Sequence, residues 1–184
     1  MISPNEGNES AASSVNLTDL VAKVFKPGGW LQEALSLEHR PEQDTMATTV
    51  SQSMSRDQAL IFEAGTGVGK SLAYLIPGII HSIESKRPAV ISSNTIALQE
   101  QIQQKDLPIC RELFQAIPEL NAYADFKSTL LVGKGNYLCP TRLGNAIANK
   151  TELFPNDELE ELQRIAAWSQ TTQNGLRQEL NPTP

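Results

Sequence analysis

The feature that most constrains the fold of this chain is a glycine-rich segment at residues 64–71, between a short apolar run and a helical pattern. It differs from the phosphate-binding pattern G-x-x-x-x-G-K-[ST] only in its first residue, which is alanine. Glycines at alternate positions let the backbone bend so that successive N–H groups converge on phosphate oxygens. The segment consists of Ala64, Gly65, Thr66, Gly67, Val68, Gly69, Lys70 and Ser71.

The last two side chains of the segment supply the remaining chemistry. Lys70 can reach the β- and γ-phosphates as a flexible point charge, and the Ser71 hydroxyl can ligate Mg²⁺. We therefore expect the segment to bind ATP with Mg²⁺, with Lys70 as the catalytic residue. The alternative is a glycine-rich turn without a ligand, but the predicted strand before the segment and the predicted helix after it favour a phosphate loop.

Apolar patterns on both sides of the segment predict an α/β fold. The runs at 59–62, 88–91 and 129–132 are mostly apolar and have the length of buried strands. Apolar residues at helical spacing occur at 17–25, 43–54, 71–85, 95–105 and 156–168. Alternation of the two patterns predicts a parallel sheet flanked by helices, the arrangement of P-loop NTPases.

Composition limits the class of protein. The 184 residues suffice for one domain, and 15 Lys plus Arg against 21 Asp plus Glu give a net charge of −6. That balance excludes a generally basic coat for nucleic acid, but it allows a local basic groove. No apolar run approaches the roughly 18 residues of a membrane span, and the polar start is no signal peptide. We expect a soluble, cytoplasmic protein with no membrane partner and a disordered tail at 1–16.

Several strings around the loop resemble the DinG-type branch of the XPD-like superfamily 2 helicases. They lie at 25–29, 40–43, 63–71, 91–101, 105–108 and 133–139, and the resemblance covers about residues 17 to 175. It implies an ATP-dependent DNA helicase in which two RecA-like lobes close on ATP and step along single-stranded DNA. Residues 17–184 would be the N-terminal part of the first, RecA-like ATP-binding domain, which would be incomplete here. Residues 134–184 would begin an iron–sulfur-type insertion.

The resemblance assigns further site residues. Arg40 and Gln43 would contact adenine, and an amide side chain carries the donor and acceptor that the adenine edge requires. The alternative for Gln43 is a solvated residue at a helix start. A cluster of small polar side chains would touch the backbone of single-stranded DNA, and its alternative is a plain helix cap. This cluster consists of Ser92, Ser93, Asn94 and Thr95.

The two cysteines, Cys110 and Cys139, form neither a disulfide framework nor a complete zinc site. Cys110 lies in an apolar stretch and is expected in the core. Cys139 occupies the place of the first [4Fe–4S] ligand in the resembled family. A cluster needs four cysteines, and no other cysteine follows Cys139, so the cluster would require a longer chain. The alternative is a free thiol packed against apolar surface.

Two parts of a motor are missing from the sequence pattern. Adjacent acidic residues occur only at 157–158 and 160–161, behind a Phe-Pro-Asn break, and they do not end a strand. No second RecA-like domain is expected within 184 residues. The chain alone would therefore bind ATP without hydrolysing it. The competing hypotheses are a nucleotide-binding module without motor activity and a small-molecule kinase, and the segments at 40–43 and 92–95 speak against the kinase.

Overall fold

The structure, a computed structural model, describes residues 16–149 and 156–180. Contacts between residues divide the chain into two compact units, Met1–Thr129 and Leu130–Pro184. Of the predicted tail at 1–16, all but Asn16 lies outside the described residues. The predicted iron–sulfur-type insertion stays a prediction.

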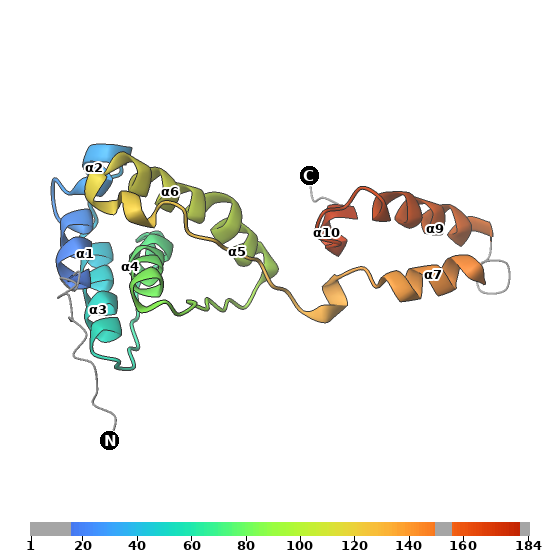
Figure 1. The fold of residues 1–184 in the computed structure, drawn as a ribbon, viewed down its shortest axis with the longest axis horizontal. Coiled ribbons are helices and arrows are strands. Elements are labelled where there is room, and N and C mark those ends of the chain that lie inside the picture. Colours follow the sequence, from blue (N-terminus) through green and yellow to red (C-terminus); the bar gives the residue numbers. More distant parts are fainter. Residues whose placement is uncertain (1–15, 150–155, 181–184) are drawn as a thin grey trace, which may run out of the picture. The chain divides into compact units, whose positions relative to one another are not determined.

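The first unit is a group of packed helices (Figure 1). In chain order these are α1 (Leu17–Phe25), α2 (Trp30–Leu35), α3 (Pro41–Ser55), α4 (Lys70–Ser85), α5 (Ile96–Gln101), the π-helical turn η1 (Ile102–Asp106), α6 (Leu107–Ala116) and the 3₁₀ turn η2 (Pro118–Tyr123). The helix α3 lies between α1 and α4, and α6 packs against α2, α4 and η2. The predicted helices at 17–25, 43–54, 71–85 and 95–105 are confirmed.

The first helix begins and ends where its sequence predicts. The Asn16 side chain accepts a hydrogen bond of 3.3 Å from the Asp19 N–H and so caps α1. At the other end, a side chain at Gly29 would lie 2.6–2.8 Å from three backbone carbonyl oxygens, those of Lys23, Val24 and Lys26. Only glycine lets the chain pass so close to the end of α1, and the next helix begins at the following residue.

The core of the first unit is one cluster of apolar side chains to which α1, α3, α4 and α6 all contribute. Both α4 and α6 are amphipathic, with one apolar face each, and the side chains of Leu75, Ile80 and Phe114 on these faces are completely buried. The Phe114 ring packs edge-on against the ring of Tyr123, with the ring centroids 6.2 Å apart. The Tyr123 hydroxyl donates a 2.7 Å hydrogen bond to the Glu84 carboxylate, which ties η2 to α4. Burial, together with this carboxylate, raises the pKa of Tyr123 above its usual value.

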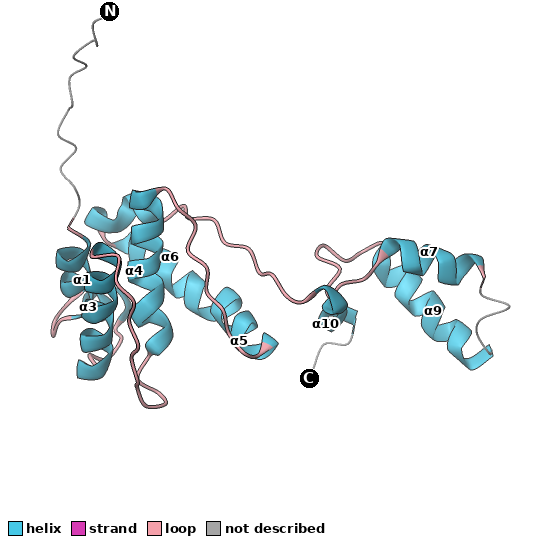
Figure 2. Cartoon of the chain, turned by 90° about the horizontal axis from the view of Figure 1, so that it is seen from below, coloured by secondary structure: helices cyan, strands magenta, loops and turns pink. Residues whose placement is uncertain are grey.

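The predicted parallel sheet is wrong. Among the described residues there is no strand, and the runs at 59–62, 88–91 and 129–132 lie in loops (Figure 2). Each run leaves a large apolar side chain exposed, since Ile61 is 99%, Val90 89% and Leu131 79% exposed, although Val132 is buried and Phe62 is half-buried. A strand is stable only beside a neighbour that completes its hydrogen-bond ladder, and composition does not reveal that neighbour.

The second unit contains η3 (Lys134–Asn136), α7 (Pro140–Ala148), α9 (Asn156–Ser169) and α10 (Arg177–Leu180). Its start is tied to its end by an antiparallel bridge between Tyr137 and Leu176 and by a 2.7 Å hydrogen bond from the Leu138 N–H to the Gly175 carbonyl. The helix α7 packs against α9, whose predicted position is confirmed. In the described ranges of both units, every helix is too short or too polar to cross a bilayer.

Candidate nucleotide-binding site

The glycine-rich loop at 64–69 leads directly into α4. Gly67 and Gly69 have φ angles of +83° and +80°, and such left-handed backbone costs other residues about 1–2 kcal/mol. Gly69 is the N-cap of α4, so the first N–H groups of a 16-residue helix lie at the end of the loop. These donors and the positive end of the helix dipole are the elements of an anion site. The loop geometry therefore fits the predicted phosphate site.

The charged side chain of this segment lies across the loop. The Lys70 ammonium donates a 3.0 Å hydrogen bond to the Ala64 carbonyl, and the Lys70 side chain is exposed. Ser71, in the first turn of α4, is half-buried. Among the remaining loop residues, Gly65 and Thr66 are exposed and Val68 is half-buried. The positive charge predicted to hold phosphates is thus accessible at the helix start.

Two side chains from the start of α3 hold the loop. The Arg40 guanidinium donates to the Gly67 carbonyl, and the Gln43 amide nitrogen donates to the Gly69 carbonyl at 2.8 Å. Gln43 is only 7% exposed, so the alternative of a solvated glutamine is wrong. The structure therefore brings both predicted adenine contacts to the predicted phosphate loop. Sequence reasoning missed the two hydrogen bonds, which join residues 26 and 27 positions apart.

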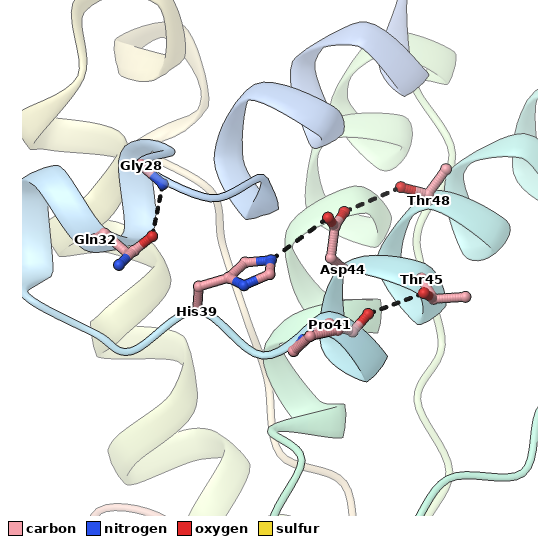
Figure 3. Close-up of polar contacts among 7 residues, drawn as sticks. All are labelled: Gly28, Gln32, His39, Pro41, Asp44, Thr45 and Thr48. Carbon is pink, nitrogen blue, oxygen red and sulfur yellow. Dashed lines mark hydrogen bonds and ion pairs between the residues drawn. The ribbon is translucent and has the colours of Figure 1, made fainter.

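Figure 3 shows a pair of side chains, His39 and Asp44, that the sequence analysis did not single out. The His39 Nε2 atom is 3.7 Å from the Asp44 Oδ2 atom, and the Thr48 hydroxyl donates to the other Asp44 oxygen at 3.4 Å. His39 immediately precedes Arg40, and Asp44 immediately follows Gln43. An acidic residue in the first turn of a helix was the one signal that could have drawn attention to this pair.

The polar cluster at 92–95 caps a helix. The Thr95 hydroxyl accepts a 3.2 Å hydrogen bond from the Leu98 N–H and is the N-cap of α5. The Ser93 hydroxyl donates to the Thr95 carbonyl at 3.0 Å, while Ser92 and Asn94 are exposed. The capping alternative is thus confirmed for Thr95. Contact of this cluster with DNA stays a prediction.

The two cysteines differ in environment. Cys110 is completely buried on α6, as predicted, whereas Cys139 is exposed at the N-cap of α7. The alternative of a Cys139 thiol packed against apolar surface is wrong. Within 16–149 and 156–180, no three His, Cys, Asp or Glu side chains gather into a group that could hold a metal ion. The role of Cys139 as a cluster ligand stays a prediction.

These environments predict a contrast in thiol reactivity. Burial raises the pKa of Cys110 to about 12, the Asp106 carboxylate adds to the rise, and Arg111 opposes it. With a pKa of about 12, only about 10⁻⁴ of the buried thiol is ionised at pH 8. We expect a disulfide reagent to modify one thiol, Cys139, within minutes, and Cys110 only after denaturation. Cys139→Ser should abolish the fast phase, and two fast equivalents in the native chain would contradict the burial of Cys110.

Curated proteins with similar sequences identify the family. The chain is 36% identical over 162 residues to "ATP-dependent helicase DinG" of Mycobacterium tuberculosis, over 81% of this chain and 24% of that protein. It is 33% identical over 152 residues to "ATP-dependent DNA helicase YoaA" of Escherichia coli, over 82% of this chain and 22% of that protein. It is 36% identical over 140 residues to "ATP-dependent DNA helicase DinG" of Salmonella choleraesuis, over 69% of this chain and 18% of that protein. The chain belongs to the DinG-type helicase family.

The family assignment confirms the resemblance seen in the sequence, and the named relatives are enzymes. No protein-family model matches the chain. The chain spans about a quarter of the length of the first of these DinG-type relatives.

Proposed function

We propose that this chain supplies the ATP site of an ATP-dependent DNA helicase. The observation that carries the proposal is the double contact between the first turn of α3 and the glycine-rich loop at the start of α4. A loop held in this way presents its N–H groups in one arrangement before a ligand arrives, which lowers the ordering cost of binding. Hydrolysis and movement along DNA are proposed for the whole protein.

Each part of the loop has a role in this proposal. The N–H groups at the start of α4 would bind phosphate oxygens, and Lys70 would leave the Ala64 carbonyl to place its charge between the β- and γ-phosphates. Mg²⁺, when bound with the nucleotide, neutralises charge on the phosphates. Such ions are held largely by phosphate oxygens and water, so the single hydroxyl of Ser71 is a fitting ligand.

The Gln43 amide retains what is needed to read adenine. One of its two N–H groups donates to the Gly69 carbonyl, which leaves one N–H donor and the carbonyl oxygen. Adenine offers an acceptor at N7 and a donor at N6, so the remaining pair is complementary to its edge. The Arg40 guanidinium, which donates to the Gly67 carbonyl, would lie at the same site. A base bound there would be linked directly to the phosphate loop.

The proposed base contact predicts a loss of nucleotide selectivity in Gln43→Ala. Loss of the loop contact should weaken ATP and GTP alike, whereas loss of a bidentate base contact, about 1–3 kcal/mol, should affect ATP alone. We expect the ratio of ATP to GTP affinity to fall by about tenfold, measured by titration calorimetry. Gln52→Ala, a glutamine on the same helix, is the control. Equal losses for both nucleotides would leave Gln43 with a structural role only.

The DNA part of the proposal concerns residues 92–95 before α5. Their exposed polar side chains, Ser92 and Asn94, are of the type that contacts phosphates. Two of the relatives are named DNA helicases. Fluorescence anisotropy with a single-stranded oligonucleotide tests this part. Binding that weakens steeply with salt and is reduced in Asn94→Ala supports the contact, and binding unaffected by Asn94→Ala contradicts it.

A further inference from the structure

The Arg40 side chain contacts the loop, but α3 holds the backbone of Arg40 only on its C-terminal side. Its backbone is extended, with φ −128° and ψ +113°, as the following Pro41 requires. Its carbonyl accepts a 3.1 Å hydrogen bond from the Asp44 N–H, the first bond of the helix. On its other side, residues 37–39 belong to no helix or strand. Something else must hold that side if the guanidinium is to stay on the Gly67 carbonyl.

The His39 side chain supplies that hold. Its Nε2 atom is buried and has no hydrogen-bond partner among the described residues, and the Asp44 carboxylate is 3.7 Å away, within ion-pair distance. With hydrogen on Nε2, the imidazole is attracted to the Asp44 carboxylate, and this attraction offsets part of the cost of burying the nitrogen without a hydrogen bond. The Thr48 hydroxyl donates to the second Asp44 oxygen at 3.4 Å and so orients the carboxylate (Figure 3).

Asp44 therefore contacts two successive residues: its backbone N–H bonds to the carbonyl of Arg40, and its carboxylate lies beside the His39 side chain. We propose that Asp44, acting through His39, is a positioning residue that keeps Arg40 on the phosphate loop. The inference rests on the proposed function, because it assigns these residues to the ATP site. Among the described residues neither side chain has a hydrogen bond or ion pair to the loop, so we assign their effect to Arg40.

The experiment compares three variants of the full chain. Hydrogen exchange at residues 65–69 is measured without nucleotide, and ATP affinity is measured by calorimetry. We expect Asp44→Asn and His39→Ala each to speed exchange by about two- to fivefold and to lower ATP affinity by a similar factor, as for the loss of one partly exposed ion pair. Glu42→Gln removes an exposed acid from the same helical turn and should change neither. An equal effect of Glu42→Gln would assign the result to the helix dipole and overturn the proposal.

A double-mutant cycle with Arg40→Ala separates positioning from general stability. If Asp44 acts through Arg40, Asp44→Asn should change exchange and affinity by less than about 1.5-fold in the Arg40→Ala background. Additive effects would overturn the proposal. If Asp44→Asn fails to fold, Thr48→Val provides the second test, and it should shift exchange in the same direction, whereas unchanged exchange would overturn the inference. Absence of ATP binding by the unmodified chain would refute the proposed function, while the exchange data would still decide the inference.

Discussion

Replacing Lys70 with alanine is expected to lower the affinity of the chain for ATP by about tenfold or more. Lys70 is the first residue of α4, and its exposed ammonium therefore lies next to the loop. A charge-assisted contact with phosphate contributes about 1.5–3 kcal/mol. The 3.0 Å hydrogen bond to the Ala64 carbonyl must be given up on binding, which offsets a small part of that gain. The substitution leaves the backbone N–H groups of the site in place, so weak binding should persist.

The comparison among nucleotides sharpens this test. Lys70 is assigned to the β- and γ-phosphates, so Lys70→Ala should weaken ATP and ADP strongly and AMP little. Lys105→Ala, which removes another exposed lysine of the first unit, should leave all three affinities unchanged. Calorimetric titration measures each affinity, and a thermal unfolding scan confirms that the variant is folded. Unchanged ATP affinity in Lys70→Ala would refute the phosphate site.

The helices that the sequence predicted, α1, α3, α4, α5 and α9, could be found because their signals are local. Apolar residues at helical spacing define one face of α1 and of α4, and caps such as Asn16 lie within a turn of the residues they bind. Helix ends have the same local character. Gly29 follows a Pro-Gly pair, and a side chain there would collide with three carbonyl oxygens at the end of α1, which explains the need for glycine.

The sheet was predicted wrongly because a strand is defined by its partner. The apolar run around Ile61 has the composition of a buried strand, yet the Ile61 side chain is 99% exposed. Composition measures how well a segment would fit a buried surface, not whether that surface is present. The error over Cys139 has the same origin. Tyr137 and Leu138 are half-buried, and the thiol that follows them is exposed at a helix start.

The site was predictable in part. Lys70 and the loop glycines follow from the spacing of one short pattern, and the positive φ angles of Gly67 and Gly69 agree with the need for glycine there. The contacts from Arg40 and Gln43 to the loop could not be predicted, since they depend on how α3 packs against α4. Only the structure shows that the residues assigned to the base also hold the loop assigned to the phosphates.

Phe114→Ala is expected to be the most damaging single substitution in the first unit. The ring is completely buried on α6 and makes edge-on contacts with the rings of Tyr123 and Phe126, each at 6.2 Å between centroids. Loss of a buried phenylalanine costs about 3–5 kcal/mol, because the lost burial adds to the cavity that remains. Since a domain of this size is stable by about 5–15 kcal/mol, the variant should lose a large share of its stability.

Urea denaturation followed by circular dichroism measures this loss, and Ile61→Ala is the matched control. Ile61 is as apolar as Phe114 but 99% exposed, so its truncation should change the free energy of unfolding by less than about 0.5 kcal/mol. A loss below about 1 kcal/mol in Phe114→Ala would show that α6 is not packed on η2 and α4 as described. Any fall in ATP affinity of Phe114→Ala should match its unfolded fraction, because the ring lies in the core and not at the loop. A larger fall would mean that α6 reaches the nucleotide site by a route other than stability.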